Sequence, residues 1–203
     1  MILIIDYGLG NVRSIYAKIE QMGEPVTISS DIESIENADK IILPGVGSFD
    51  SGMENIRKLG IRDTLDRKVC RDKLPILGIC LGMQLLTRKS EEGMLPGLGY
   101  IDADTRKFSF GTTTNLNIPH MGWNTIIINQ RSPLLEGIVT NLRFYFVHSY
   151  HVACDLPENI VASTQYGYEF PSIIQQENIF GVQFHPEKSH KQGIQLIKNF
   201  VRM

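Results

Sequence analysis

A cysteine at position 80 lies between two glycines, where an apolar run meets a helix-like run in Gly78-Ile-Cys80-Leu-Gly82. This is the cysteine counterpart of the G-x-S-x-G elbow, a sharp strand-to-helix turn that exposes a nucleophile. Glycines let strand and helix approach closely, and the helix N-terminus favours thiolate over thiol. Cys80 is therefore a candidate nucleophile, although a buried cysteine that opens a core helix fits the same five residues.

A second candidate group, Phe184-His185-Pro186-Glu187, follows an apolar strand-like stretch near the end of the sequence. Open α/β sheets build their sites at the carboxyl ends of strands, so we expect His185 to lie near Cys80. Pro186 stiffens the turn, which lets His185 face the thiol while Glu187 holds the far ring nitrogen. Taken alone, His185 could be a hydrogen-bonded polar residue at the end of a strand. Together with the cysteine elbow, the segment predicts a catalytic triad in which Cys80 is the nucleophile, His185 the base and Glu187 the residue that orients the base.

A glycine-rich stretch, residues 42–49 (ILPGVGSF), follows another predicted strand. The glycines on either side of Val46 allow its backbone N–H to turn toward a substrate. With the N–H of Leu81, directly after the nucleophile, Val46 completes a predicted oxyanion hole. Without the elbow, the same stretch would be an ordinary turn.

The first half of the sequence alternates short apolar strands with helical patterns. Strands are predicted at 1–6, 25–29, 40–44 and 75–79, and helices at 11–23, 49–60 and 61–70. This alternation predicts right-handed crossovers and an α/β fold: a mostly parallel open sheet with helices on both faces.

From about Tyr100 the patterns become strand-like and rich in turns, which predicts antiparallel strand additions at one side of the sheet. INQRSP (128–133) is among the strand-like stretches, and Tyr166-Gly167 and Glu177-Asn178 are predicted turns. A helix is expected to close the chain over residues 193–201.

Composition narrows the possible classes of function. The 203 residues are 42% hydrophobic and 21% charged with a net charge of −2, which predicts one globular domain over 1–203 without a basic surface for nucleic acid or anionic membrane. MILIID is expected to be a first strand rather than a leader, and the protein to be cytoplasmic. Three cysteines without paired spacing indicate neither disulfides nor a zinc site, and Cys70 and Cys154 are predicted to be packing residues.

The stretch YGLGNVRS, residues 7–14, resembles the start of a dinucleotide-binding fingerprint. That fingerprint needs a third glycine where this chain has Arg13, and no acidic residue follows the next strand in the ribose-binding position. A tight strand-to-helix turn, with Asn11 as the helix cap, is the preferred interpretation.

Taken together, GICLGMQLL, PGVGSF and FHPEKS resemble the class I glutamine amidotransferases, over nearly the whole chain. The resemblance implies a flavodoxin-like sheet and a cofactor-free, metal-free reaction. In it, Cys80 attacks the side-chain amide of glutamine, His185 protonates the departing ammonia, and water hydrolyses the thioester to glutamate. It also assigns glutamine-binding roles to Gly47, Gln84, Glu92, Ser149 and Tyr150.

Three further stretches, PHMGWN (119–124), FYFVHSY (144–150) and RKSEEG (88–93), are similar to one branch of that family. In this branch the glutaminase forms a heterodimer with a barrel-fold cyclase subunit, which makes imidazole glycerol phosphate and AICAR in histidine biosynthesis. The resemblance implies that the cyclase docks on Asn11, Ser14, His120, Met121, Trp123, Tyr145 and Lys188. For Trp123 a core position is the alternative, and His148 and His151 are expected to be structural.

Alternatives to this function remain open from the sequence. One is a paralogous glutaminase that feeds ammonia to a sugar-modifying synthetase of surface polysaccharide biosynthesis. Another, of a different class, is a non-catalytic partner-binding subunit, against which the presence of all three triad residues argues. A solitary amidase or protease is disfavoured by the partner-facing PHMGWN. Residues 105–118 carry no recognisable motif.

Overall fold

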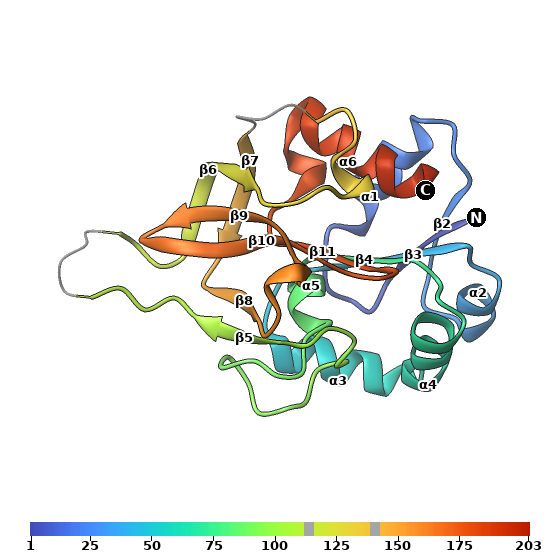
Figure 1. Cartoon of the computed structure of the whole chain (residues 1–203). Coiled ribbons are helices and arrows are strands. Elements are labelled where there is room, and N and C mark those ends of the chain that lie inside the picture. The colour runs from blue at the N-terminus through green and yellow to red at the C-terminus, as the bar shows by residue number, and fades with distance from the viewer. Residues whose placement is uncertain (112–115, 139–142) are drawn as a thin grey trace.

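A nine-stranded sheet runs through the computed structural model, which describes residues 1–111, 116–138 and 143–203 (Figure 1). Its strand order is β2-β1-β3-β4-β11-β10-β9-β6-β7, and β5 and β8 form a separate pair. The strands are β1 (Ile2–Ile5), β2 (Val26–Ser29), β3 (Lys40–Gly45), β4 (Ile76–Cys80), β5 (Ala103–Lys107), β6 (His120–Ile128), β7 (Arg143–His148), β8 (Tyr150–Cys154), β9 (Ile160–Tyr166), β10 (Tyr168–Gln176) and β11 (Ile179–Val182).

The sheet has a parallel half and an antiparallel half. Strands β2, β1, β3, β4 and β11 run parallel, whereas β10, β9, β6 and β7 pair antiparallel. The hairpin turns lie at Gly167 and at Glu177-Asn178, where they were predicted. The predicted mostly parallel α/β sheet with antiparallel additions at one side is confirmed.

Helices cover both faces of the parallel half (Figure 1). They are α1 (Val12–Glu20), α2 (Ile32–Glu36), α3 (Phe49–Lys58), α4 (Arg62–Leu65), the π-helical η1 (Asp66–Arg71), α5 (Leu81–Leu85), the 3₁₀ turns η2 (Pro133–Leu135), η3 (Pro157–Asn159) and η4 (Pro186–Lys188), and α6 (His190–Arg202). Helices α1 and α6 pack in one hydrophobic cluster, and α2 to α5 in the other. None of these described helices combines the length and apolar character that crossing a bilayer requires.

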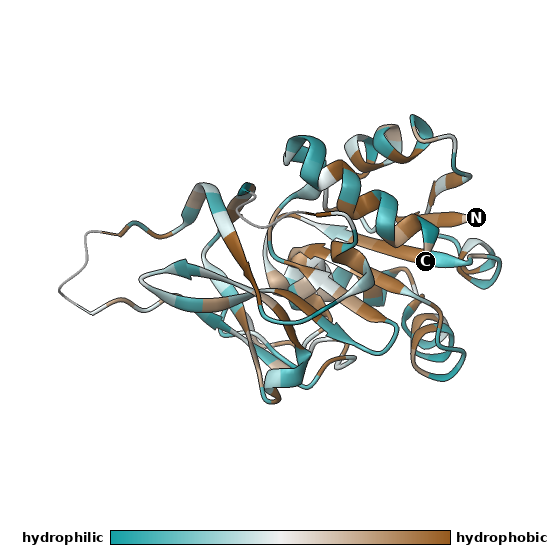
Figure 2. Cartoon of the chain, turned by 45° about the horizontal axis from the view of Figure 1, so that its top comes forward, coloured by the Kyte–Doolittle hydropathy of each residue, from teal (hydrophilic) through white to brown (hydrophobic). Residues whose placement is uncertain are grey.

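The sequence pattern explains this layering. Strands β1, β3 and β4 are buried along almost their whole length, as expected for parallel strands covered on both sides. Helix α6 instead buries one stripe, Leu196, Ile197, Phe200 and Val201, and Figure 2 shows such helices with hydrophobic and hydrophilic residues on opposite sides.

One long strand-like stretch, RFYFVHSYHVA, is broken in the middle. Strand β7 ends at His148 and pairs with β6, whereas β8 begins at Tyr150 and pairs with β5. Ser149 therefore lies at the junction between the two sheets (Figure 1).

Some local predictions were wrong. Asn11 precedes α1 but its side chain makes no capping hydrogen bond. Cys70, predicted to be a packing residue, is exposed on the π-helical η1, directly after the buried Val69. INQRSP is a strand only at its first residue, since β6 ends at Ile128. Of the segment without a motif, residues 112–115 lie outside the described residues.

A close approach between β3 and α5 fixes the junction that follows β4. A side-chain carbon on Gly82 would overlap the carbonyl oxygen of Leu43, and one on Gly78 would lie 2.7 Å from the backbone of Gly82. Only glycine fits these two positions, so the glycines of the predicted elbow are required by packing.

Gly82→Ala should therefore destabilise the fold by at least about 3 kcal/mol, because the added carbon meets a backbone atom that cannot rotate away. The free energy of unfolding in urea measures this loss. Gly23→Ala is the control: Gly23, unlike Gly82, has a positive φ, but nothing lies within 4 Å of an added carbon, so only the backbone strain of about 1 kcal/mol is expected. Equal losses for the two variants would contradict the packing argument.

Candidate active site

Cys80 is the last residue of β4 and directly precedes α5. Its backbone has φ 54° and ψ −108°, a strained conformation for a residue with a side chain, and the residue is 6% exposed. Cys80 lies beside Gly45 at the end of β3, and Val182 at the end of β11 pairs with Ile79. The glycine-rich loop, the cysteine and the His-Pro-Glu segment thus follow three neighbouring strands at one edge of the sheet.

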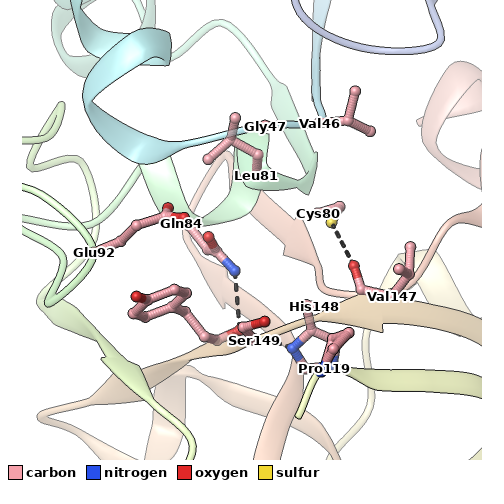
Figure 3. A pocket seen from close by; sticks show the side chains of 11 residues that line it. Val46, Gly47, Cys80, Leu81, Gln84, Glu92, Pro119, Val147, His148 and Ser149 are labelled. Carbon is pink, nitrogen blue, oxygen red and sulfur yellow. Dashed lines mark hydrogen bonds between the residues drawn. The ribbon is translucent and has the colours of Figure 1, made fainter.

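A pocket of about 310 Å³ opens above the cysteine (Figure 3). All seven residues expected to bind substrate or oxyanion line it together with Cys80: Val46, Gly47, Leu81, Gln84, Glu92, Ser149 and Tyr150. Three residues that the sequence did not indicate complete the lining: Pro119, Val147 and His148. The Cys80 sulfur lies 3.9 Å from the carbonyl oxygen of Val147, on the far wall.

His185 and Glu187 are both buried, and Glu187 Oε1 accepts a hydrogen bond from His185 Nδ1 at 3.0 Å. Burial alone would lower the pKa of His185, but the nearby Cys80 and Glu187 outweigh it and raise that pKa to about 10. Nε2 is buried and makes no hydrogen bond of ordinary geometry among the described residues. The ring is protonated near neutral pH and its Nε2 is available as a donor.

The turn that carries His185 and Glu187 is held by α6. Ser189 Oγ donates to the carbonyl oxygen of His185 at 2.6 Å and accepts from the N–H of Tyr145 at 3.0 Å. The N–H of His185 donates to the carbonyl oxygen of Tyr145, and a side-chain carbon on Gly193 would overlap the carbonyl oxygen of Pro186. The base is therefore positioned by β7 on one side and by α6 on the other.

Gln183 is a site residue that the sequence analysis missed. It is fully buried, and its Nε2 lies 3.8 Å from the Cys80 sulfur. Its Oε1 accepts from Gln84 Nε2 at 3.2 Å, and Gln84 Nε2 also donates to the carbonyl oxygen of Tyr150 at 3.0 Å. A polar residue inside the apolar run FGVQFHP was the available signal. The chain of amides gives the sulfur a hydrogen-bond donor.

His148 was expected to be structural, yet it lines the pocket and belongs to a buried hydrogen-bonded chain. His148 Nδ1 donates to the carbonyl oxygen of Tyr150 at 2.7 Å, so its Nε2 accepts from His120 Nδ1 at 3.0 Å. His120 Nε2 in turn accepts from Asn124 at 3.2 Å. Burial lowers the pKa of His120 to about 4 and holds that of His148 well below its usual range, so both rings are neutral.

The expectation that His120 faces a partner is not met by its side chain, which is 2% exposed. His120 alternates with Met121 along β6, and the exposed side chains beside it are those of Met121 and Trp123. His151 is structural as predicted: it is buried and contacts the hydroxyl of Tyr168 at 2.8 Å. Among the described residues, no three His, Cys, Asp or Glu side chains are grouped to hold a metal ion.

Gln183→Met should slow the alkylation of Cys80, because the sulfur loses the hydrogen-bond donor that Gln183 supplies. The measurement is the rate of alkylation by iodoacetamide, read at each cysteine by mass spectrometry. Cys70, which is exposed, is the internal reference and should keep its rate, and Gln165→Met, an exposed glutamine on β9, is the control variant. An unchanged rate at Cys80 would contradict this role of Gln183.

Glu187→Gln should lower the pKa of His185 from about 10, because the ring loses its anionic partner. The folded pKa lies above the ordinary 6.5, so protonated His185 stabilises the fold fully below about pH 6.5 and this contribution is lost as pH rises through about 10. The variant should lose it at lower pH. NMR titration of the His185 ring protons checks the shift, and an unchanged titration would refute it.

Comparison with known proteins agrees with the family resemblance seen in the sequence motifs. The family model "Glutamine amidotransferase class-I" matches residues 3–203. A Methanococcus maripaludis protein described as "Imidazole glycerol phosphate synthase subunit HisH 2" is 53% identical over 202 residues, covering 100% of this chain and 99% of its own. A Pseudomonas aeruginosa protein of the same description is 46% identical over 203 residues and covers all of both chains.

Solved structures agree at the level of the fold. A crystal structure of a glutamine amidotransferase, 19% identical in sequence, superimposes with a TM-score of 0.76 over 99% of this chain and 97% of its own. The cysteine elbow, the His-Pro-Glu turn and the match along almost the full length lead to one assignment: the chain belongs to the class I glutamine amidotransferase family.

Proposed function

We propose that this chain is the glutaminase subunit of imidazole glycerol phosphate synthase. It hydrolyses glutamine to glutamate and passes the ammonia to a barrel-fold cyclase subunit, which forms imidazole glycerol phosphate and AICAR in histidine biosynthesis. The observation that carries the proposal is the pocket: a strained cysteine opens into it, beside a buried histidine-glutamate pair. The full-length similarity to proteins named as subunits of this synthase supports the choice of pathway.

The reaction follows from the positions of three side chains. The Cys80 thiolate attacks the side-chain carbonyl carbon of glutamine, and the C–N bond breaks as His185 Nε2 donates its proton to the departing nitrogen. The neutral imidazole then takes a proton from a water molecule that attacks the thioester, and glutamate leaves as the thiol is restored. Glu187 keeps the ring oriented through both steps by its hydrogen bond to Nδ1.

The two ends of glutamine meet different walls of the pocket. Val46 and Leu81 line the pocket together with Cys80, and their N–H groups are assigned to the oxyanion. At the other end, the carboxylate of Glu92 is assigned to the α-ammonium group. The remaining assigned contacts come from Gly47, Gln84, Ser149 and Tyr150, which line the same pocket.

A face suited to a protein partner lies close to this pocket. Met121 is 61% exposed, and Trp123 is 37% exposed, which supports an interface rather than a core position. The Trp123 ring stacks on His190 at 4.8 Å, and Lys188 lies 5.8 Å from the centre of the Tyr145 ring. Aromatic residues with a few polar anchors are typical of the buried centre of an interface.

The same face continues onto α1 and reaches the pocket. Asn11 is exposed and Ser14 half-buried, and α1 packs against η4, which contains Lys188. Met121 pairs across the sheet with Val147, whose carbonyl oxygen contacts the Cys80 sulfur. A cyclase bound on this face would cover the mouth of the pocket, so that ammonia reaches its acceptor without being protonated in water.

Cys80→Ala should abolish glutamine-dependent synthesis by the complex with the cyclase while leaving ammonia-dependent synthesis intact. The variant lacks the nucleophile but retains the docking face. Imidazole glycerol phosphate formation is measured with glutamine or with an ammonium salt, and wild-type glutaminase activity is measured with and without the purified cyclase and its nucleotide ligand. Equal loss with both nitrogen sources would mean that Cys80 supports the fold or interface instead.

The same assay tests which partner enzyme receives the ammonia. Methanococcus maripaludis has two relatives, numbered HisH 1 and HisH 2, so a parallel mixture with a sugar-modifying synthetase is a useful arm. Stimulation by that synthetase, and none by the histidine-pathway cyclase with its ligand, would overturn the proposed pathway. Absence of any glutaminase activity in the presence of either partner would favour a non-catalytic subunit.

A further inference from the structure

Two carboxylates join the start of α3 to the segment between α5 and β5. Glu92 Oε2 accepts from the N–H of Phe49, the first residue of α3, at 2.8 Å. In the opposite direction, Asp50 Oδ1 accepts from the N–H groups of Met94 and Leu95, each at 3.0 Å, and Asp50 Oδ2 accepts from Met94 at 2.9 Å. We call this reciprocal pair of contacts the carboxylate clasp.

The clasp gives hydrogen-bond acceptors to backbone N–H groups of Phe49, Met94 and Leu95. The first N–H groups of a helix have no partner within the helix, and a carboxylate beside them is favoured by the helix dipole. Glu92 takes one of these N–H groups, while Asp50, from the first turn of α3, fixes the two residues that follow Gly93. Met94 is 94% exposed, so its backbone rather than its side chain holds it to α3.

Gly93 allows the close approach that the clasp requires. A side-chain carbon at Gly93 would overlap Asp50 Oδ1 and would lie 2.8 Å from Oδ2. The position directly after Glu92 therefore has no room for a side chain while the Asp50 carboxylate remains in place. The pair of contacts is thus a packed unit and not a chance meeting of flexible side chains.

The clasp lies between the two ends of the pocket. Phe49 follows Gly47 by two residues, so the Glu92–Phe49 hydrogen bond ties the assigned ammonium site to the loop assigned to the oxyanion. Glu92 also lines the pocket, and Figure 3 shows its side chain there beside Gln84. One Glu92 oxygen is thus fixed on α3 while the residue faces the same pocket as Cys80.

We propose that Asp50 is a positioning residue for glutamine recognition: by anchoring Met94 and Leu95, it holds Glu92 in the orientation that binds the α-ammonium group of the substrate. This inference rests on the proposed glutaminase function and deepens it. Asp50 does not line the pocket and acts only through the segment that carries Glu92. Its loss should therefore weaken recognition of the amino group and leave the chemistry at Cys80 in place.

The test compares glutamine with glutaramate, the analogue that lacks the α-amino group, in the wild-type glutaminase-cyclase complex and in an Asp50→Ala complex. The ratio of kcat/KM for glutamine to kcat/KM for glutaramate should fall about tenfold in Asp50→Ala, more through the KM for glutamine than through kcat. The reason is that a misplaced carboxylate no longer binds the ammonium group, which only glutamine carries. The ratio is taken within one preparation, so it does not depend on the fraction of folded enzyme. Asp50→Asn, which keeps one acceptor, should give an intermediate ratio.

Four further variants make the test specific. Gly93→Ala should lower the ratio in the same direction, because the added carbon displaces the Asp50 carboxylate. Glu92→Gln should lower it at least as far, and adding Asp50→Ala to Glu92→Gln should lower it no further. Glu54→Ala is the matched control: Glu54 lies on the same helix and pairs only with Lys58 among the described residues, so its ratio should equal that of the wild type.

Each contradictory result has a distinct meaning. If Asp50→Ala lowers kcat/KM for both substrates by the same factor, or leaves both unchanged, the positioning role is overturned while the glutaminase function stands. If Asp50→Ala and Glu92→Gln lower the ratio independently, Asp50 does not act through Glu92. If the wild-type complex hydrolyses neither substrate, it is the proposed function that fails.

Discussion

The site depends on the contact between α5 and the end of β3. Because Gly82 presses against the carbonyl oxygen of Leu43, the chain must turn sharply after β4, and this turn forces Cys80 into a positive φ. The same contact fixes the end of β3 beside the cysteine, and so fixes where the Val46 loop begins. The proposed nucleophile and the loop proposed to supply an oxyanion donor are therefore positioned by one backbone contact.

Around this contact, the pocket is framed by polar groups that are almost all paired. The carbonyl oxygen of Tyr150 accepts from both Gln84 and His148, which connects the amide chain behind the sulfur to the histidine chain behind β6. A buried polar group without a partner costs about 1–3 kcal/mol, so each member holds its neighbours in one arrangement. The His185 Nε2 and Glu187 Oε2 atoms are exceptions, and both belong to the groups assigned to catalysis.

How much of this was visible in the sequence depended on distance along the chain. The elbow glycines, the His-Pro-Glu turn and the alternation of strands and helices are local patterns, and they predicted the fold and the pocket residues Cys80, Val46 and Leu81. The other five predicted residues of the pocket came from the family resemblance. Gln183 was missed because its contact with Cys80 follows from β4 and β11 being neighbours in the sheet. The inward position of His120 depends on the register of β6 against β7, which its neighbours in PHMGWN do not reveal. Cys70 was misjudged because its prediction rested on the usual burial of cysteine and not on its place on the helix.

The turn that bears His185 is locked by Ser189, the residue that precedes α6, and by Gly193 within α6, the last helix described. A polypeptide leaves the ribosome from its N-terminus, so Cys80 emerges more than a hundred residues before the imidazole that serves it. Chains of this size generally fold as units. The nascent protein therefore carries a thiol without a base until synthesis reaches α6. Because His185 and α6 come late in the sequence, the chain can hydrolyse its substrate only after α6 has been synthesised and packed.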